Sequence, residues 1–210
     1  MLENALVELK NGINIENSTL YAKKVWKGRL SEETNAALYI KNENEENFVA
    51  SAKFYYGSKP YNRPWAEIFN ISNKPSPSLS SFFGSAFENA LLALIARHLE
   101  PGGYIFVEYY EDRETQYCLM VGFPAPITRL GYQLFNLGFT WFKDWYFPEG
   151  FMEGGQKLQA QTALDNASKE RHLLQIKSEV AAFLKTAPQF DKSEYLLRAI
   201  ERAKKISGEA

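Results

Sequence analysis

Residues 81–112 place a helix signal directly before a strand signal, and this pairing constrains the fold more than any other stretch. Apolar residues recur at helical spacing from Phe83 to Ile95, which predicts an amphipathic helix with one buried face. The Pro-Gly-Gly run at 101–103 stops that helix, because proline clashes with the preceding turn and glycine suits a left-handed exit. The next run, 104–109, is aromatic and β-branched, as in a strand covered on both faces. A helix followed by a buried strand predicts the centre of an α/β core.

The other patterns predict a mixed, mostly antiparallel sheet with helices packed on it, an α/β (α+β) fold. We expect strands over residues 19–26, 36–41, 48–56, 65–71, 116–121, 139–147 and 157–162. A helix is expected over 128–136, with Thr128 as its cap and Gly138 at its end. The long helix of the core is expected to be capped by Ser80 or Ser81.

The composition changes at Ala163, after which helix formers dominate. Two apolar stripes at helical spacing lie on either side of Pro188, and they predict a C-terminal helical hairpin. We therefore expect an α/β domain over residues 1–162 and a helical extension over 163–210. The extension packs on the core or on a second subunit.

Charge and cysteine content exclude several classes of function. The net charge of −1 gives no electrostatic drive toward nucleic acid or an acidic membrane, so neither is an expected partner. The single cysteine, Cys118, excludes an internal disulfide and a cysteine-only metal cluster. The two histidines, His98 and His172, are far apart in the sequence, and no metal is expected. The N-terminus has no signal-peptide pattern, so the cytoplasm is the expected compartment.

Small residues stand where the chain turns into the long helix, so backbone N–H groups there are able to approach an anion. The spacing of Ser81, Gly84 and Ala86 resembles the pyrophosphate-binding turn of the GNAT superfamily of acyl-CoA-dependent N-acyltransferases. That turn reads Arg or Gln, two residues, Gly, one residue, then Gly or Ala, and here Ser81 stands in the first position. The resemblance implies that acetyl-CoA or another acyl-CoA is bound as co-substrate by Ser81, Phe82, Phe83, Gly84, Ser85 and Ala86.

The order of elements from about Ala36 to Thr162 also resembles the GNAT fold, and the pair Gly138-Phe139 matches a Gly-Phe pair of that family. One departure is Leu134, because many members place a tyrosine there to protonate the leaving thiolate. The helices that the family inserts between its first two strands are also missing. As a hypothesis, the C-terminal hairpin fills the space that they leave near Glu67.

Four runs, PWAEIF, GGYIFVEYYEDRET, TRLG and GFTWFKDWYFPEGFMEGG, resemble a second family. It is the uncharacterised domain-of-unknown-function family 1122 of archaea and thermophilic bacteria. This second resemblance implies no activity.

The GNAT resemblance implies direct attack of an amine on a thioester, with a small molecule or a protein as the amine acceptor. The amine must lose a proton, so a carboxylate near the end of the 65–71 strand is wanted as the general base, and Glu67 is the candidate. Tyr132 or Tyr146 is the candidate general acid.

Aromatic and acidic residues concentrate near two glycine-containing turns between 139 and 158. They are interpreted either as core packing or as the wall of a polar substrate pocket. The candidate substrate-binding residues are Trp141, Asp144, Trp145, Glu149 and Glu153.

Two other functions stay open. The first is a non-catalytic GNAT-like scaffold with a binding or regulatory role, which works as a homodimer. The second is an S-adenosylmethionine-dependent methyltransferase, because LEPGGYIFVE resembles a late strand of that class. The second is the weaker one, since no glycine-rich loop follows the first strand.

Overall fold

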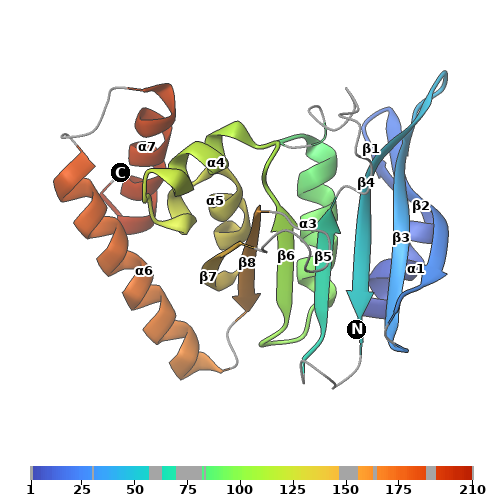
Figure 1. The fold of residues 1–210 in the computed structure, drawn as a ribbon, viewed down its shortest axis with the longest axis horizontal. Coiled ribbons are helices and arrows are strands. Elements are labelled where there is room, and N and C mark those ends of the chain that lie inside the picture. The colour runs from blue at the N-terminus through green and yellow to red at the C-terminus, as the bar shows by residue number, and fades with distance from the viewer. Residues whose placement is uncertain are drawn as a thin grey trace.

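The protein is described by a computed structural model over residues 2–29, 31–56, 63–69, 82, 84–146, 156–162, 165–187 and 193–209. An eight-stranded sheet in the order β1-β2-β3-β4-β5-β6-β8-β7 forms its centre (Figure 1). Within these strands only β5 and β6 run parallel, and every other neighbouring pair is antiparallel. The expected mixed, mostly antiparallel α/β fold is therefore confirmed.

The bounds of the strands agree closely with the alternation in the sequence. They are β1 (Ile13–Ile15), β2 (Ser18–Lys27), β3 (Glu33–Lys41), β4 (Glu46–Tyr55), β5 (Trp65–Phe69), β6 (Tyr104–Glu108), β7 (Phe139–Tyr146) and β8 (Gln156–Thr162). The helices are α1 (Leu2–Asn11), α3 (Ala86–His98), α4 (Arg113–Met120), the 3₁₀ helix η1 (Ala125–Ile127), α5 (Arg129–Asn136), α6 (Asn166–Thr186) and α7 (Glu194–Ser207).

One face of the sheet is apolar and is covered by helices. In Figure 1, α1 and α3 lie behind the strands. Leu9 of α1, Leu91 of α3 and Leu134 of α5 are fully buried in one core with Ile68 of β5 and Val107 of β6. Each leucine or isoleucine removed from water in this way contributes about 1.5–3 kcal/mol to the free energy of unfolding. The opposite face of the same strands therefore has to carry the polar side chains.

The helix and strand that organise the sequence form a crossover, in which β5 leads through α3 to the parallel strand β6. The pairing of β5 with β6 is continuous from Trp65–Tyr104 to Ile68–Val107. The helix begins later than expected, because Ser85 and not Ser80 or Ser81 is its cap. The Ser85 hydroxyl accepts a hydrogen bond from the Glu88 N–H at 3.3 Å. Ser80 and Ser81 lie outside the described residues.

The strand expected over 116–121 is wrong, because α4 occupies that stretch. The Asp112 carboxylate accepts a hydrogen bond from the Thr115 N–H at 3.4 Å and so caps a helix start that the apolar pattern hid. Cys118 of α4 is fully buried with residues of α6 and α7. Packing against the C-terminal helices therefore overrides the strand-like run.

The boundaries of α5 are confirmed. Thr128 caps this helix by accepting a hydrogen bond from the Gly131 N–H at 3.1 Å. The helix ends at Asn136, and Gly138 has a φ of +92°, a left-handed conformation that favours glycine.

The C-terminal helices form a second core with α4 and η1. Its buried members are Cys118, Phe123, Ile127, Ile176, Val180, Phe183, Ala187, Leu196, Ala199, Ala203 and Ile206. Figure 1 shows α6 and α7 at the β7 end of the sheet, beyond β6 and β8 when counted from β5. The hairpin is therefore not beside Glu67, and the hypothesis that it fills a space there is wrong.

Candidate functional site

Glu67 of β5 carries its carboxylate on the face of the sheet that the helices leave uncovered. Side chains alternate along a strand, so Ala66 and Ile68 point into the core while Glu67 points away from it. Glu67 is nevertheless only 8% exposed. A buried carboxylate is costly unless positive charges and hydrogen bonds compensate for the lost water.

Two lysines from neighbouring strands provide that compensation. Lys157 of β8 donates a hydrogen bond to Glu67 Oε1. Lys53 of β4 lies directly opposite Glu67 in the antiparallel register, with its Nζ 3.5 Å from Oε2. Lys157 is 4% exposed, so the charges of Glu67 and Lys157 are both shielded from water. We call Lys53, Glu67 and Lys157 the β5 charge cluster.

Aromatic rings lie against the β5 charge cluster. The Nζ of Lys53 is 5.2 Å from the ring centre of Phe69, and the Nζ of Lys157 is 5.7 Å from the same ring. An ammonium group at this distance is attracted by the negative face of the ring. Trp65, on the same side of β5, stacks on Tyr55 with 5.7 Å between ring centres. The charges are thus held in an aromatic setting of low polarity.

The same face of the sheet carries further polar side chains. We call these side chains and the β5 charge cluster together the polar face. Its buried members are Glu33, Asn35, Ser51, Glu67, Glu108, Lys157 and Gln159, and Lys53 is partly buried. Among the described residues, Ser51 Oγ and Gln159 Oε1 are buried without a hydrogen-bond partner. Buried polar atoms are usually paired, so each of these atoms would gain a hydrogen bond from a polar ligand on this face.

The predicted pyrophosphate turn, at the start of α3, holds a carboxylate of the protein itself. Gly84 has a φ of +84°, and its N–H donates to Glu88 Oε2 at 2.5 Å. Ser85 caps the helix, and Ala86 is the first residue of α3. Phe82 is fully buried, whereas Ser81 and Phe83 lie outside the described residues.

Arg129, the first residue of α5, completes this second cluster. Its Nη1 lies 3.0 Å from Glu88 Oε2, and its Nε donates to Asp112 Oδ2 at 2.9 Å. Burial alone lowers the pKa of Arg129, but the carboxylates of Glu88 and Asp112 outweigh it and raise the pKa above its usual value. The guanidinium therefore stays charged, and the two carboxylates are neutralised within the protein. We call Glu88, Asp112 and Arg129 the α3 charge cluster.

The candidate general acids are not brought to Glu67 by the described structure. Tyr132 of α5 packs against the second core, on the helix-covered side of the sheet. Leu134, two residues later, is fully buried in the main core. The side chain of Tyr146 lies outside the described residues.

The candidate substrate-binding residues do not form one wall. Trp141 lies opposite Gln161, and Asp144 lies opposite Leu158, so the two side chains point to opposite faces of β7. Asp144 accepts a hydrogen bond from the Tyr109 hydroxyl at 2.5 Å. Trp141 lines a pocket against α6. Glu149, Glu153 and the side chain of Trp145 lie outside the described residues.

The sequence carries a signal for the two lysines and for Arg129, although none of them is among the predicted site residues. Lys53, Glu67 and Lys157 each place a charged side chain within a strand. Arg129 directly follows the Thr128 cap, inside the TRLG run. Which partners these charges meet depends on strand order, which the sequence did not specify.

Two other features of the described residues bear on function. They contain no group of three His, Cys, Asp or Glu side chains placed to hold a metal ion. No helix in the described part of the chain combines the length and the apolar character that crossing a bilayer requires.

Comparisons with known proteins identify a family without a known activity. Residues 16–187 match the family described as a protein of unknown function, DUF1122. The chain is also similar to the crystal structure of a protein of unknown function, AQ1966, from Aquifex aeolicus VF5. The TM-score is 0.80 at 36% sequence identity, covering 98% of each chain. No curated protein matches. This chain therefore belongs to the DUF1122 family.

Proposed function

We propose that the protein is a GNAT-like N-acyltransferase, which moves an acyl group from acyl-CoA directly to an amine. The order of elements supports this proposal. A hairpin of strands is followed by β5, a glycine turn, α3, β6, a helix ending in Gly138-Phe139, and the pair β7 and β8. This is the order that the resemblance to the GNAT superfamily implies, with α4 as an addition.

The observation that carries the proposal is the position of Glu67. It lies on β5, the strand on which the general base is expected, and its neighbour β6 runs parallel to β5. Carboxylates are seldom placed on a buried strand without a partner, and here two lysines hold one. Buried charges with a specific partner of opposite charge are candidates for functional sites.

The chemistry assigned to Glu67 is removal of a proton from the amine. The neutral amine attacks the thioester carbonyl carbon, a C–N bond forms, and the C–S bond breaks. The amine proton passes to the Glu67 carboxylate directly or through water, and the departing thiolate takes up a proton to give the free thiol. Lys53 and Lys157 hold the carboxylate in place.

The turn at Gly84 suits an anion, because its N–H already binds the Glu88 carboxylate. A pyrophosphate would compete with Glu88 for the same donor. Binding of acyl-CoA at this turn therefore requires Glu88 to leave, while Arg129 remains as a cation beside the turn. In this role Arg129 supplies the positive charge that Ser81 does not provide.

A second candidate function is a GNAT-like scaffold that has no catalytic activity. The closed α3 charge cluster favours it, because both carboxylates and the guanidinium are already paired. Leu134 also favours it, since a hydroxyl is expected at that position in an active enzyme. The mostly antiparallel sheet gives no support to the methyltransferase alternative.

Calorimetric titration with acetyl-CoA tests the proposal, with S-adenosylmethionine as the control ligand. Glu88→Gln keeps the shape of the side chain but removes the competing charge, so it should tighten acetyl-CoA binding about tenfold. Glu114→Gln is the matched control, because Glu114 is also buried and is paired with Arg198 and Arg202 away from Gly84. It should leave the affinity unchanged.

Gly84→Val is expected to abolish acetyl-CoA binding by blocking backbone approach. A Cβ atom at Gly84 would lie 3.3 Å from Arg129 Nη1, and the φ of +84° disfavours valine, so its thermal unfolding has to be measured as well. Glu67→Gln should bind acetyl-CoA normally and lose transfer to amines. If neither ligand binds to any variant, the scaffold is the better assignment, and binding of S-adenosylmethionine alone would favour a methyltransferase.

A further inference from the structure

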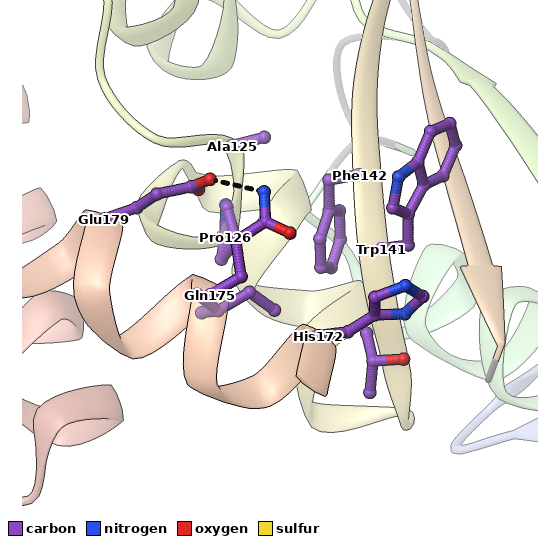
Figure 2. A pocket seen from close by; sticks show the side chains of 9 residues that line it. Ala125, Pro126, Trp141, Phe142, His172, Gln175 and Glu179 are labelled. Carbon is purple, nitrogen blue, oxygen red and sulfur yellow. Dashed lines mark hydrogen bonds between the residues drawn. The ribbon is translucent and has the colours of Figure 1, made fainter. Parts of the chain in front are cut away.

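A pocket lies between η1, β7 and α6, separated from β5 by β6 and β8 (Figure 2). Its volume is about 90 Å³. Aromatic and polar side chains meet in it, and it is lined by Ala125, Pro126, Thr140, Trp141, Phe142, His172, Gln175, Ile176 and Glu179. The sequence indicated a role only for Trp141, because the pocket is formed by segments far apart in the chain.

Two lining residues carry buried polar atoms without a partner. Among the described residues, neither Thr140 Oγ1 nor His172 Nδ1 makes a hydrogen bond. Thr140 is 2% exposed, so its hydroxyl has little access to bulk water. Because buried polar atoms are normally paired, both atoms indicate that the pocket holds something with hydrogen-bonding groups.

The other polar groups decide which kind of molecule fits. Gln175 Nε2 donates to Glu179 Oε1 at 2.9 Å, which fixes the orientation of the amide. Figure 2 shows that the amide oxygen of Gln175 consequently faces toward Phe142. This oxygen, the Glu179 carboxylate and the Thr140 hydroxyl all accept hydrogen bonds, and so does His172 Nδ1 when the ring proton is on Nε2.

A pocket rich in acceptors and bordered by a carboxylate prefers a cationic donor. An anion would be repelled by Glu179, and a neutral hydroxyl compound would have too few donor hydrogens for these acceptors. The rings of Trp141 and Phe142 also line the pocket, and aromatic faces attract ammonium groups. The volume is about that of three water molecules in the liquid, so only a few heavy atoms of a ligand lie inside the pocket.

We propose that this pocket binds a small primary amine in its ammonium form. The site does not depend on acyl transfer, because two strands separate it from Glu67. If the pocket does not bind an amine, the proposed acyl transfer is unaffected. If the protein does not bind acyl-CoA, the proposal for the pocket is unaffected. The competing explanation is that ordered water alone pairs with Thr140 and His172.

The direct test is an NMR titration of the full chain that follows the indole N–H signal of Trp141. The probes are ethylammonium, ethanol and acetate, which have similar size and differ in charge. Ethylammonium should saturate with a dissociation constant on the order of 1–10 mM, as expected for a ligand of so few atoms. Ethanol and acetate should bind at least about tenfold more weakly.

Isosteric variants separate charge from hydrogen bonding. Glu179→Gln preserves an acceptor for the Gln175 amide but removes the charge, and it should weaken ethylammonium about fivefold or more. Glu170→Gln makes the same change on an exposed part of α6 that does not line the pocket, and it should have no effect. Thr140→Val keeps the side-chain shape, removes the unpartnered hydroxyl, and should also weaken binding at least about fivefold.

Equal binding of ethanol and ethylammonium would overturn the proposal, as would unchanged ethylammonium binding in both Glu179→Gln and Thr140→Val. Water would then be the only occupant. Because Glu179 is exposed, Glu179→Gln will fold and gives a decisive result even if Thr140→Val does not.

Discussion

Glu67 and Glu88 are both buried carboxylates, but their partners differ in kind. Glu88 is 1% exposed and lies in the first turn of α3, where it accepts the Gly84 N–H and binds Arg129. Glu67 is 8% exposed and lies in the middle of β5, where it meets the ammonium groups of Lys53 and Lys157. Glu88 is therefore held by a backbone N–H and a guanidinium, whereas Glu67 is held by two flexible lysine side chains.

This difference indicates which of the two clusters is suited to chemistry. The planar guanidinium of Arg129 has fixed donors, and it joins α3, α4 and α5 through Glu88 and Asp112. An ammonium group is a point charge on a flexible stem, and it adjusts when a neighbour changes. The polar face around Glu67 also retains the unpaired atoms Ser51 Oγ and Gln159 Oε1. We therefore infer that the α3 charge cluster fixes the fold and that the β5 charge cluster is available to a ligand.

Arg129→Met should have the largest effect on stability. It leaves Glu88 and Asp112 buried without a positive charge, which should lower the free energy of unfolding by about 5 kcal/mol. Urea unfolding measures the loss. Arg198→Met is the matched control, because the side chain of Arg198 is 48% exposed and Glu114 keeps Arg202. It should lower the free energy of unfolding by less than about 1 kcal/mol. Equal losses in the two variants would show that Arg129 contributes no more to stability than an exposed arginine.

Glu67→Leu should have the next largest effect, a loss of about 3 kcal/mol. It removes the carboxylate that the buried Lys157 binds, whereas Lys53 is nearer to water. The double variant Glu67→Leu with Lys157→Met removes both charges, and it should recover most of the stability in the same urea experiment. Additive losses in the double variant would contradict the pairing of these two side chains.

The sequence predicted the elements of the fold better than their partners. The strand patterns located every strand of the sheet except β1. They also predicted one strand, over 116–121, where the structure has the helix α4. The helix stop at 101–103 and the cap at Thr128 were correct, because local backbone chemistry determines both. The error at 116–121 arose because a short apolar run has the same pattern in a strand and in a helix packed on both sides.

The candidate site was predicted only in part, because its partners come from distant segments. Glu67 was singled out from its strand, but Lys157, 90 residues later, meets it only through the insertion of β8 beside β6. Glu88 lies four residues after Gly84 and accepts the N–H of the turn, a contact that the small-residue pattern does not indicate. Arg129 reaches Glu88 from 41 residues away. Such contacts depend on tertiary structure, which local patterns do not specify.

Cys118 is also buried and ionisable, but its surroundings disfavour the anion, because Arg202 only partly offsets the effects of burial and of the nearby carboxylates. Burial, followed by the nearby Glu114, raises the pKa of the Cys118 thiol to about 12. The native state therefore binds the thiol proton more tightly than the unfolded state, so the stability is unaffected at neutral pH and falls as pH rises toward about 12. A disulfide reagent at pH 8 should react with unfolded protein and hardly at all with native protein. Rapid native reaction would contradict this burial.

Ser51→Ala should have the smallest effect, and it tests the contrast between the clusters. The Ser51 hydroxyl is fully buried and unpartnered on the polar face, so its removal should change the free energy of unfolding by less than about 0.5 kcal/mol. Thr115→Val is the comparison near the α3 charge cluster, because the Thr115 hydroxyl accepts the Leu130 N–H at 3.1 Å. Its loss should cost about 1–3 kcal/mol by urea unfolding. If Ser51→Ala cost as much, the polar face would already be satisfied, and the reason for placing a ligand beside Glu67 would be lost.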